Sequence, residues 1–155
     1  MTCHPGAKGA ERSVHDERGS VLVEFSFVFA LFVLVIYALI SFGMILATKQ
    51  SLTHAATEGA RAAISVVDDP STPLVDERAK RALDQVGTSL NWLGDKYQPS
   101  DATATIAPCP SAAASQCITV TITYPYDTRP IVPPAPGLGL VTPKKLTSTA
   151  VVELT

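Results

Sequence analysis

Residues 18–47 read RGSVLVEFSFVFALFVLVIYALISFGMILA, and this stretch decides how the chain is organised. Its part from 25 to 47 holds 23 residues without a charge. As an α-helix rising about 1.5 Å per residue, that part is about 35 Å long, which is enough to cross a bilayer. One carboxylate, Glu24, directly precedes it and lies five residues after Gly19. Because a charge at the edge of a membrane helix is costly, Glu24 is a candidate functional residue.

Residues 1–19 form a polar leader of mixed charge that holds too little apolar surface to fold alone. A secretory signal peptide has an apolar core of about 7–15 residues that ends at a small-residue cleavage site. Here the apolar run is longer and lacks such a site, so we expect it to remain as one transmembrane segment at about 25–47. The basic residues on its two sides are nearly balanced. We expect the N-terminus in the cytoplasm, and this expectation rests partly on a pair of cysteines, Cys109 and Cys117, that is expected to lie on the outer side.

The composition bounds the rest of the chain. Of its 155 residues, about ninety remain for a globular head after the leader and the long helix. The net charge of −2 leaves no basic surplus for binding nucleic acid. The aromatic content of 6% gives little material for a large hydrophobic cleft. A small head with a modest core follows.

Cys109 and Cys117 bracket a short segment rich in proline, alanine and serine. Their separation suits a disulfide that closes a hairpin, and a free pair of buried thiols is the alternative. On the chain-entropy model such a bridge stabilises the fold by roughly 2 to 3 kcal/mol. If it forms, this part of the chain lies in an oxidising compartment.

The helical pattern does not stop at Ala47, because residues 48–65 contain no proline and continue it. We expect one helix over 20–65. Beyond the membrane it carries a small-residue stripe at i, i+3, i+4 and i+7 spacing: Ala56, Gly59, Ala60 and Ala63. A glycine inside a helix costs about 1 kcal/mol relative to alanine, which favours close packing by another element. The alternative is an alanine-rich surface that simply favours helix formation.

A turn is predicted over 66–72, and a second helix follows it. Thr72 is placed to cap that helix with Pro73 at its first position, and Gly94 is placed to end it. Its apolar face consists of Val75, Ala79, Ala82, Leu83, Val86, Leu90 and Leu93. This amphipathic pattern predicts a helix that lies on an apolar surface.

From Ala102 the apolar pattern changes to a period of two, which predicts strands. They are expected at 102–106, 118–124 and 146–154, and the second is the clearest. Its residues on one face are Ile118, Val120, Ile122 and Tyr124, with threonines on the other face.

Residues 125–143 contain six prolines and two glycines, which suits a spacer rather than a strand in a sheet interior. The whole pattern predicts an α+β fold. It comprises a long N-terminal transmembrane helix continuing outside the membrane, an amphipathic second helix and a small antiparallel sheet of about three strands. The predicted organisation is a leader at 1–19, the long helix at 20–65 and an extracytoplasmic head at 66–155.

Few residues suggest catalysis. His54 and Glu58 stand four apart on the long helix, but two ligands do not make a metal site, and a polar helix face explains them equally well. The sequence contains no nucleophile-elbow pattern and no glycine-rich phosphate loop. We therefore expect no enzyme, no metal site and no cofactor.

Gly19, Ser20, Glu24 and Phe25 carry the most specific signal. A short polar leader ending in glycine, then at once an apolar helix with glutamate and an aromatic residue at its fifth and sixth places, resembles the processing site of type IV pilins. The run GSVLVEFSFVFALFVLVIY, followed by LTHAATEGARAA, resembles the TadE-like family of pseudopilins from tight-adherence (Flp) pilus systems. That resemblance covers about 19–65. The later part, with ITVTITYPY, a proline-rich link and a last strand, is similar but less specific.

The resemblance implies cleavage between Gly19 and Ser20 by a membrane-embedded aspartyl prepilin peptidase. It implies a minor pilus component or assembly factor in the cytoplasmic membrane. The implied partners are the prepilin peptidase, other pilins or pseudopilins, the assembly platform and the lipid bilayer. Glu24, near the positive end of the helix dipole, would pair with the new α-amine of a neighbouring subunit. The alternative is an uncleaved single-pass membrane-anchored binding module whose helix is only a tether.

Overall fold

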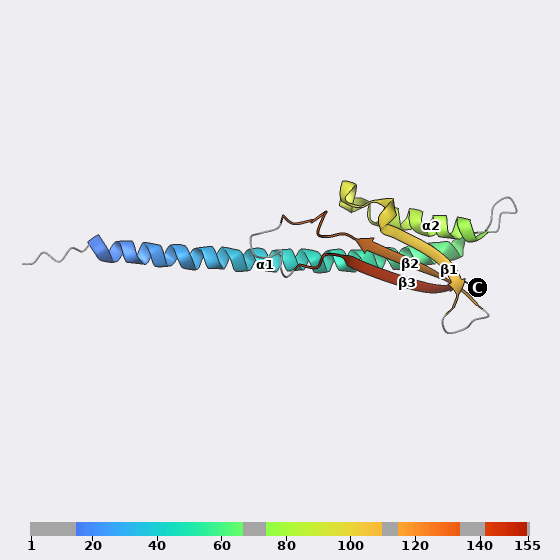
Figure 1. Cartoon of the computed structure of the whole chain (residues 1–155), viewed down its shortest axis with the longest axis horizontal. Helices are drawn as coiled ribbons and strands as arrows, with labels where there is room; N and C mark the ends of the chain where they lie inside the picture. Colours follow the sequence, from blue (N-terminus) through green and yellow to red (C-terminus); the bar gives the residue numbers. More distant parts are fainter. Residues whose placement is uncertain (1–14, 67–73, 110–114, 134–141, 155) are drawn as a thin grey trace, which may run out of the picture. The chain divides into compact units, whose positions relative to one another are not determined.

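A computed structural model describes residues 15–66, 74–109, 115–133 and 142–154 (Figure 1). The chain divides into two compact units, Met1–Leu39 and Ile40–Thr155, which are described separately below. Residues 1–14 of the expected leader lie outside the described residues. The same holds for the expected turn after residue 66, including Thr72 and Pro73, and for residues 134–141 of the proline-rich segment.

The described part of the first unit is the beginning of a helix. Helix α1 spans His15–Ala62, 48 residues, and therefore starts upstream of Gly19 rather than at residue 20. No proline separates His15 from Gly19, and extending an existing helix by a few residues costs little. The large apolar side chains from Val21 to Ile36 are between 40% and 73% exposed. The described chain therefore offers them no covering surface.

In the second unit, the side of α1 that faces the head is buried. Its first residues are Ser41, Ile45, Thr48 and Leu52, each at most 7% exposed and recurring at helical spacing. This buried side begins inside the apolar run, so the head covers the last turns of that run. After Ala62 the helix tightens into the 3₁₀ turn η1, Ala63–Ser65, which brings the helical stretch to its expected end.

Helix α2, Leu74–Ser89, carries the expected apolar face. Ala82 and Val86 are fully buried, whereas Val75 is 48% exposed, contrary to its expected place on that face. Val75 is exposed because it lies in the first part of α2, where none of residues 75–81 is buried. The apolar face of α2 reaches the core only from Ala82 onward.

The α-helical part of this segment is shorter than expected. It ends at Ser89, and the 3₁₀ segment η2, Asn91–Lys96, replaces a continuous helix to Leu93. Gly94 has a φ of 54°, in the left-handed region that other residues avoid, and this turns the chain. A short 3₁₀ turn, η3 at Pro99–Asp101, then leads into the sheet.

The sheet has three antiparallel strands in the order β1-β2-β3, with β2 in the centre (Figure 1). β1 is Ala102–Pro108, β2 is Gln116–Tyr124 and β3 is Leu146–Leu154. β3 has its expected bounds. β1 and β2 each extend two residues further toward the loop that joins them, because the ladder continues to Pro108 opposite Gln116. The expected α+β fold, with its long helix, further helix and small antiparallel sheet, is confirmed.

One face of the sheet packs on α1 and α2. Ile118, Val120, Ile122 and Tyr124 of β2 are fully buried, in one cluster with Leu52 of α1 and Val86 of α2. Burial of each large apolar side chain in such a core contributes about 1.5–3 kcal/mol. The opposite face carries cross-strand neighbours such as Thr103, Thr121 and Thr149.

Candidate functional site

The predicted processing motif lies at the start of α1, in the first unit. Gly19 and Ser20 both have helical backbone, and a Cβ built on Gly19 would meet nothing within 4 Å. Glu24 lies four residues after Ser20, so the two residues share a face of the helix. An α-amine created at Ser20 would therefore lie on the same side of α1 as Glu24.

Glu24 is exposed among exposed apolar side chains. Within the described part of the chain it has no ion-pair partner. The neighbouring hydroxyl is already satisfied, because Ser26 Oγ donates to the Leu22 carbonyl at 2.7 Å. Phe25 stacks on Phe29 with ring centroids 5.9 Å apart. The Glu24 carboxylate thus requires a partner or water from outside the described chain.

The small-residue stripe runs from the end of α1 to Ala63 of η1, and at Gly59 it lies against α2. All four members are buried: Ala56, Gly59, Ala60 and Ala63. A Cβ built on Gly59 would come within 2.6 Å of the Val86 Cγ2 and 2.9 Å of the Ala82 carbonyl oxygen. Real Cβ atoms do not make contacts this short in a close-packed interior. The close approach of α2 therefore requires glycine at position 59.

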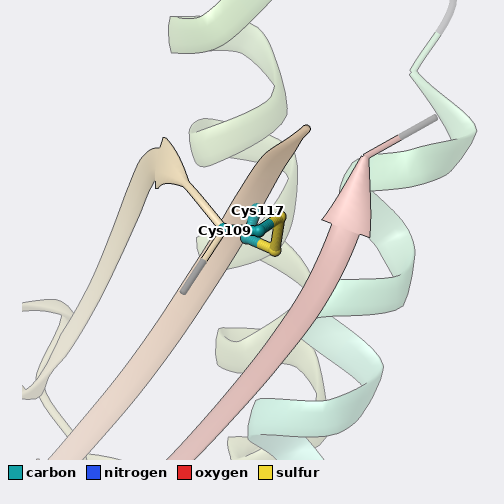
Figure 2. Close-up of a disulfide and its surroundings, with 2 residues drawn as sticks. All are labelled: Cys109 and Cys117. Carbon is teal, nitrogen blue, oxygen red and sulfur yellow. A yellow bond between two sulfur atoms is a disulfide. The ribbon is translucent and has the colours of Figure 1, made fainter. Parts of the chain in front are cut away.

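Cys109 and Cys117 form the expected disulfide, with an S–S distance of 1.99 Å (Figure 2). Cys117 lies in β2, and Cys109 directly follows β1. The Cys109 amide also donates to the Ser115 carbonyl at 2.9 Å. The bridge and this hydrogen bond together close the end of the β1–β2 hairpin.

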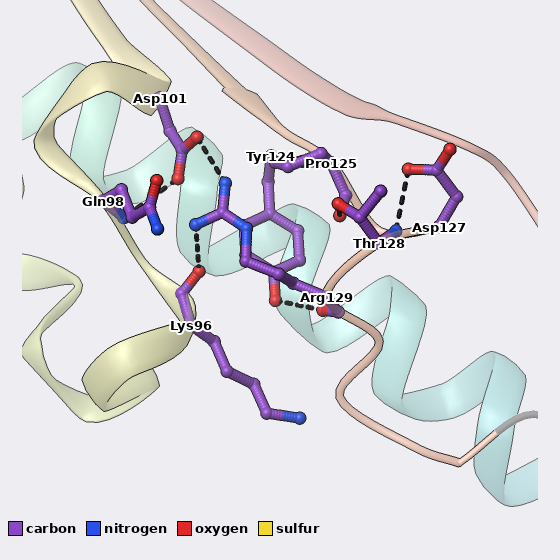
Figure 3. A network of polar contacts seen from close by, with 8 residues as sticks. All are labelled: Lys96, Gln98, Asp101, Tyr124, Pro125, Asp127, Thr128 and Arg129. Atoms are coloured by element: carbon purple, nitrogen blue, oxygen red, sulfur yellow. Dashed lines mark hydrogen bonds and ion pairs between the residues drawn. The ribbon is translucent and has the colours of Figure 1, made fainter.

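A polar network joins the loop after β2 to the segment before β1 (Figure 3). Arg129 forms an ion pair with Asp101 at 2.6 Å and donates through its other terminal nitrogen to the Lys96 carbonyl at 2.6 Å. The Tyr124 hydroxyl donates to the Arg129 carbonyl at 2.5 Å. The guanidinium carbon also lies 5.6 Å from the centroid of the Tyr124 ring. These contacts fasten the loop to η2 and η3.

Sequence reasoning missed this network. Asp101 and Arg129 are 28 positions apart, and no motif spacing links them. The available hint was an acidic and a basic residue, Asp127 and Arg129, inside a proline-rich segment. The part of that segment up to residue 130 is fixed to the head and is not a free spacer.

Two tyrosines near the network are held in the neutral form. Burial raises the pKa of Tyr97 above its ordinary value of 10.0, and the Asp101 carboxylate raises it further. Burial also raises the pKa of Tyr124, against the opposing effect of Arg129. An ordinary tyrosine is already protonated at neutral pH, and the raised pKa keeps the Tyr124 hydroxyl, which donates to the Arg129 carbonyl, protonated to higher pH.

The described residues hold no metal-binding cluster: no three His, Cys, Asp or Glu side chains among them are grouped to hold an ion. His54 and Glu58 line an open hollow of about 470 Å³ along α1, together with Lys49 and Arg61. Another open hollow, of about 560 Å³, lies between α2 and Tyr97. Both are surface depressions without a convergent set of catalytic groups.

Within the described chain, one helix is long and apolar enough to cross a membrane, over Gly19–Ser65. The comparison with protein families gives a match over the same region. Residues 19–61 match the TadE family, described as TadE-like protein, which confirms the resemblance seen in the sequence. The matched range contains Gly19, Glu24 and Gly59. No curated protein and no solved structure matches the chain.

Proposed function

We propose that this chain, TadE-like over residues 19–61, is a minor pseudopilin or assembly component of a tight-adherence (Flp) pilus. In this proposal α1 anchors it in the cytoplasmic membrane, with the N-terminus in the cytoplasm and the head outside. The observation that carries the proposal is the exposed Glu24 carboxylate in an otherwise apolar stretch that the described chain leaves uncovered. A charge in such a place is expensive and is explained by a partner.

Processing between Gly19 and Ser20 by a prepilin peptidase is part of the proposal. Glycine lets a protease site approach the backbone without a Cβ in the way. Because α1 starts at His15, the Gly19–Ser20 bond lies in the second turn of the helix, and the enzyme has to unwind the first two turns to bind the bond in an extended form. That step costs little, since residues at a helix end lack part of their hydrogen bonds and open locally.

Cleavage then supplies the partner for Glu24. The new α-amine at Ser20 has an ordinary pKa of about 7.7–8.0 and is mostly protonated at neutral pH. It pairs with Glu24 of a neighbouring subunit, and the N-terminal end of the helix dipole favours the same carboxylate. The exposed apolar side chains around Glu24 pack on lipid or on the helices of other pilins. The assembly platform in the membrane is a further partner of the chain.

An exchange of residues 19–39 tests this function against the tethered binding module. An unrelated transmembrane helix of equal length replaces them, in a host that builds these pili and lacks the native chain. The proposal predicts loss of pili by electron microscopy, although the chain still sediments with membranes. A tether predicts normal pili, because any anchor would suffice. Ser26→Ala, which removes only the hydroxyl bonded inside α1, is the matched control and keeps piliation.

A further inference from the structure

We infer that the membrane-proximal end of the head binds anionic lipid headgroups. The residues that form this contact are called the basal surface: Lys49, Trp92, Lys96, Lys144 and Lys145. The inference rests on the membrane anchorage in the proposed function, but not on processing or on pilus assembly.

Two contacts between β3 and α1 establish which end of the head is proximal. The Lys49 ammonium donates to the Thr147 carbonyl, and the hydroxyls of Thr53 and Ser148 are 2.7 Å apart. Residue numbers thus rise together along the two elements, and Figure 1 shows β3 running beside α1 in the same direction. The residues that precede β3 therefore lie toward residues 40–47 of α1, which belong to the same unit and form the last part of the apolar run.

Three of the four lysines lie in the loops at this end or contact them. Lys144 and Lys145 directly precede β3, are exposed, and have no ion-pair partner among the residues that the structure describes. The loop after β2 returns to the same place, because the Asp127 amide donates to the Lys144 carbonyl at 3.1 Å. Lys96 of η2 reaches this loop as well, through a hydrogen bond from its ammonium to the Pro130 carbonyl. Each ammonium has three donors, so even the bonded lysines keep donors for a phosphate.

Trp92 lies at the level where a bilayer interface is expected. It is the single tryptophan of the chain and is 53% exposed. Its Nε1 donates to the Ser51 hydroxyl at 3.0 Å. Ser51 is four residues beyond Ala47, which is about 6 Å along the helix. An exposed indole with its N–H satisfied, close to the end of an apolar span, is typical of the interfacial region.

The charge of this end favours anionic lipid. Among the described residues, Asp95 adjoins Lys96 and Asp127 is bonded through its amide to the Lys144 carbonyl; set against these two exposed carboxylates, the four lysines leave an excess of two positive charges. Arg129 is already paired with Asp101. Lysines within about a Debye length, ~10 Å, of a membrane attract its anionic lipids. A bilayer surface fits better than an acidic protein, because the anchoring helix holds it beside these residues.

Fluorescence of the full chain in vesicles tests the inference, since all tryptophan emission comes from Trp92. The vesicles contain phosphatidylcholine alone or an equal mixture with phosphatidylglycerol. A lipid with a nitroxide on its headgroup quenches from the interface, and iodide quenches from the water. With phosphatidylglycerol we expect emission at shorter wavelength, stronger quenching by the nitroxide and weaker quenching by iodide than with phosphatidylcholine alone.

A pair of double variants separates the lysines from general effects. K144Q/K145Q should lose most of the phosphatidylglycerol-dependent gain in nitroxide quenching. K80Q/R81Q, which removes two exposed cations of α2, should keep it. The inference is overturned if the chain resists alkaline extraction but iodide quenches Trp92 equally in both vesicles, or if K144Q/K145Q keeps the gain. A chain that alkaline extraction removes would overturn the anchorage itself, and this inference with it.

Discussion

At Gly59 the separation of two helices depends on a missing methyl group. A Cβ there would meet the Ala82 carbonyl oxygen at 2.9 Å, and backbone cannot move aside as a side chain can. The sequence indicated that a close neighbour was needed, because glycine is unfavourable inside a helix. It did not indicate that the neighbour is α2, since the contact joins residues far apart in the chain.

Gly59→Ala is expected to destabilise the fold. Overpacking costs about 1–3 kcal/mol, and the better helix propensity of alanine offsets about 1 kcal/mol of it. Gly87→Ala on α2 is the matched control, because its Cβ would meet nothing within 4 Å and the variant should gain up to about 1 kcal/mol. Urea unfolding followed by Trp92 emission measures both. A Gly59→Ala protein as stable as wild type would mean that the glycine does not set the helix separation.

Glu24→Gln removes the charge and keeps the shape of the side chain. If Glu24 serves assembly, the variant is still cleaved after Gly19 but forms few or no pili, because the α-amine loses its anionic partner. Electrophoretic mobility reports cleavage, and electron microscopy reports pili. Normal piliation by Glu24→Gln would contradict the proposed role of the carboxylate.

The raised pKa of Tyr97 predicts that the folded chain loses stability at alkaline pH. Its pKa is raised in the folded chain above the ordinary value of 10.0, so folding favours the neutral side chain. This contribution is fully present below pH 10.0 and is lost as the pH rises through the folded pKa, because the unfolded side chain ionises first. As the pH is raised beyond 10.0, the urea concentration at the unfolding midpoint should therefore decrease. This decrease with pH should be less steep in Tyr97→Phe. The same slope in both proteins would show that Tyr97 does not contribute.

At the scale of elements, periodicity predicted the sheet well. Strict alternation in residues 118–124 gave the buried face of β2, and β3 has its predicted bounds. The helix ends were predicted less well. A residue pattern does not distinguish the last α-helical turn from the 3₁₀ segment η2, since both repeat nearly every three to four residues. The early start of α1 likewise reflects the low cost of helix extension rather than a signal in the sequence.

The β1–β2 hairpin provides a prediction at this scale. Replacing both Cys109 and Cys117 with serine opens a loop whose ends are eight positions apart. The chain-entropy relation then gives a loss of about 2.5 kcal/mol. Urea unfolding of the full-length chain, produced in cells without a prepilin peptidase so that residues 1–19 are retained, measures the loss, with Cys3→Ser as a control outside the hairpin. An unchanged midpoint would show that the bridge adds nothing to the stability of the sheet.

At the scale of the molecule, apolar character alone did not reveal which part of the apolar run 25–47 is exposed and which part is buried in the second unit. The boundary between the two compact units falls between Leu39 and Ile40, and Ser41 and Ile45 of the second unit are buried although the apolar run continues to Ala47. A side chain that faces lipid and one that faces a core have the same composition. The network around Arg129 was equally hidden, since the tertiary fold brings its residues together. The division into a leader, a long helix and a head remains a prediction.

The central claim is that the chain is a processed pseudopilin. Its most direct test is the intact mass of the chain purified from cells with an active prepilin peptidase. The account predicts that residues 1–19 are absent and that the mature chain begins at Ser20, whereas a Gly19→Val chain stays full length. A wild-type chain that retains Met1 to Gly19 in those cells would contradict the claim and favour the tethered binding module.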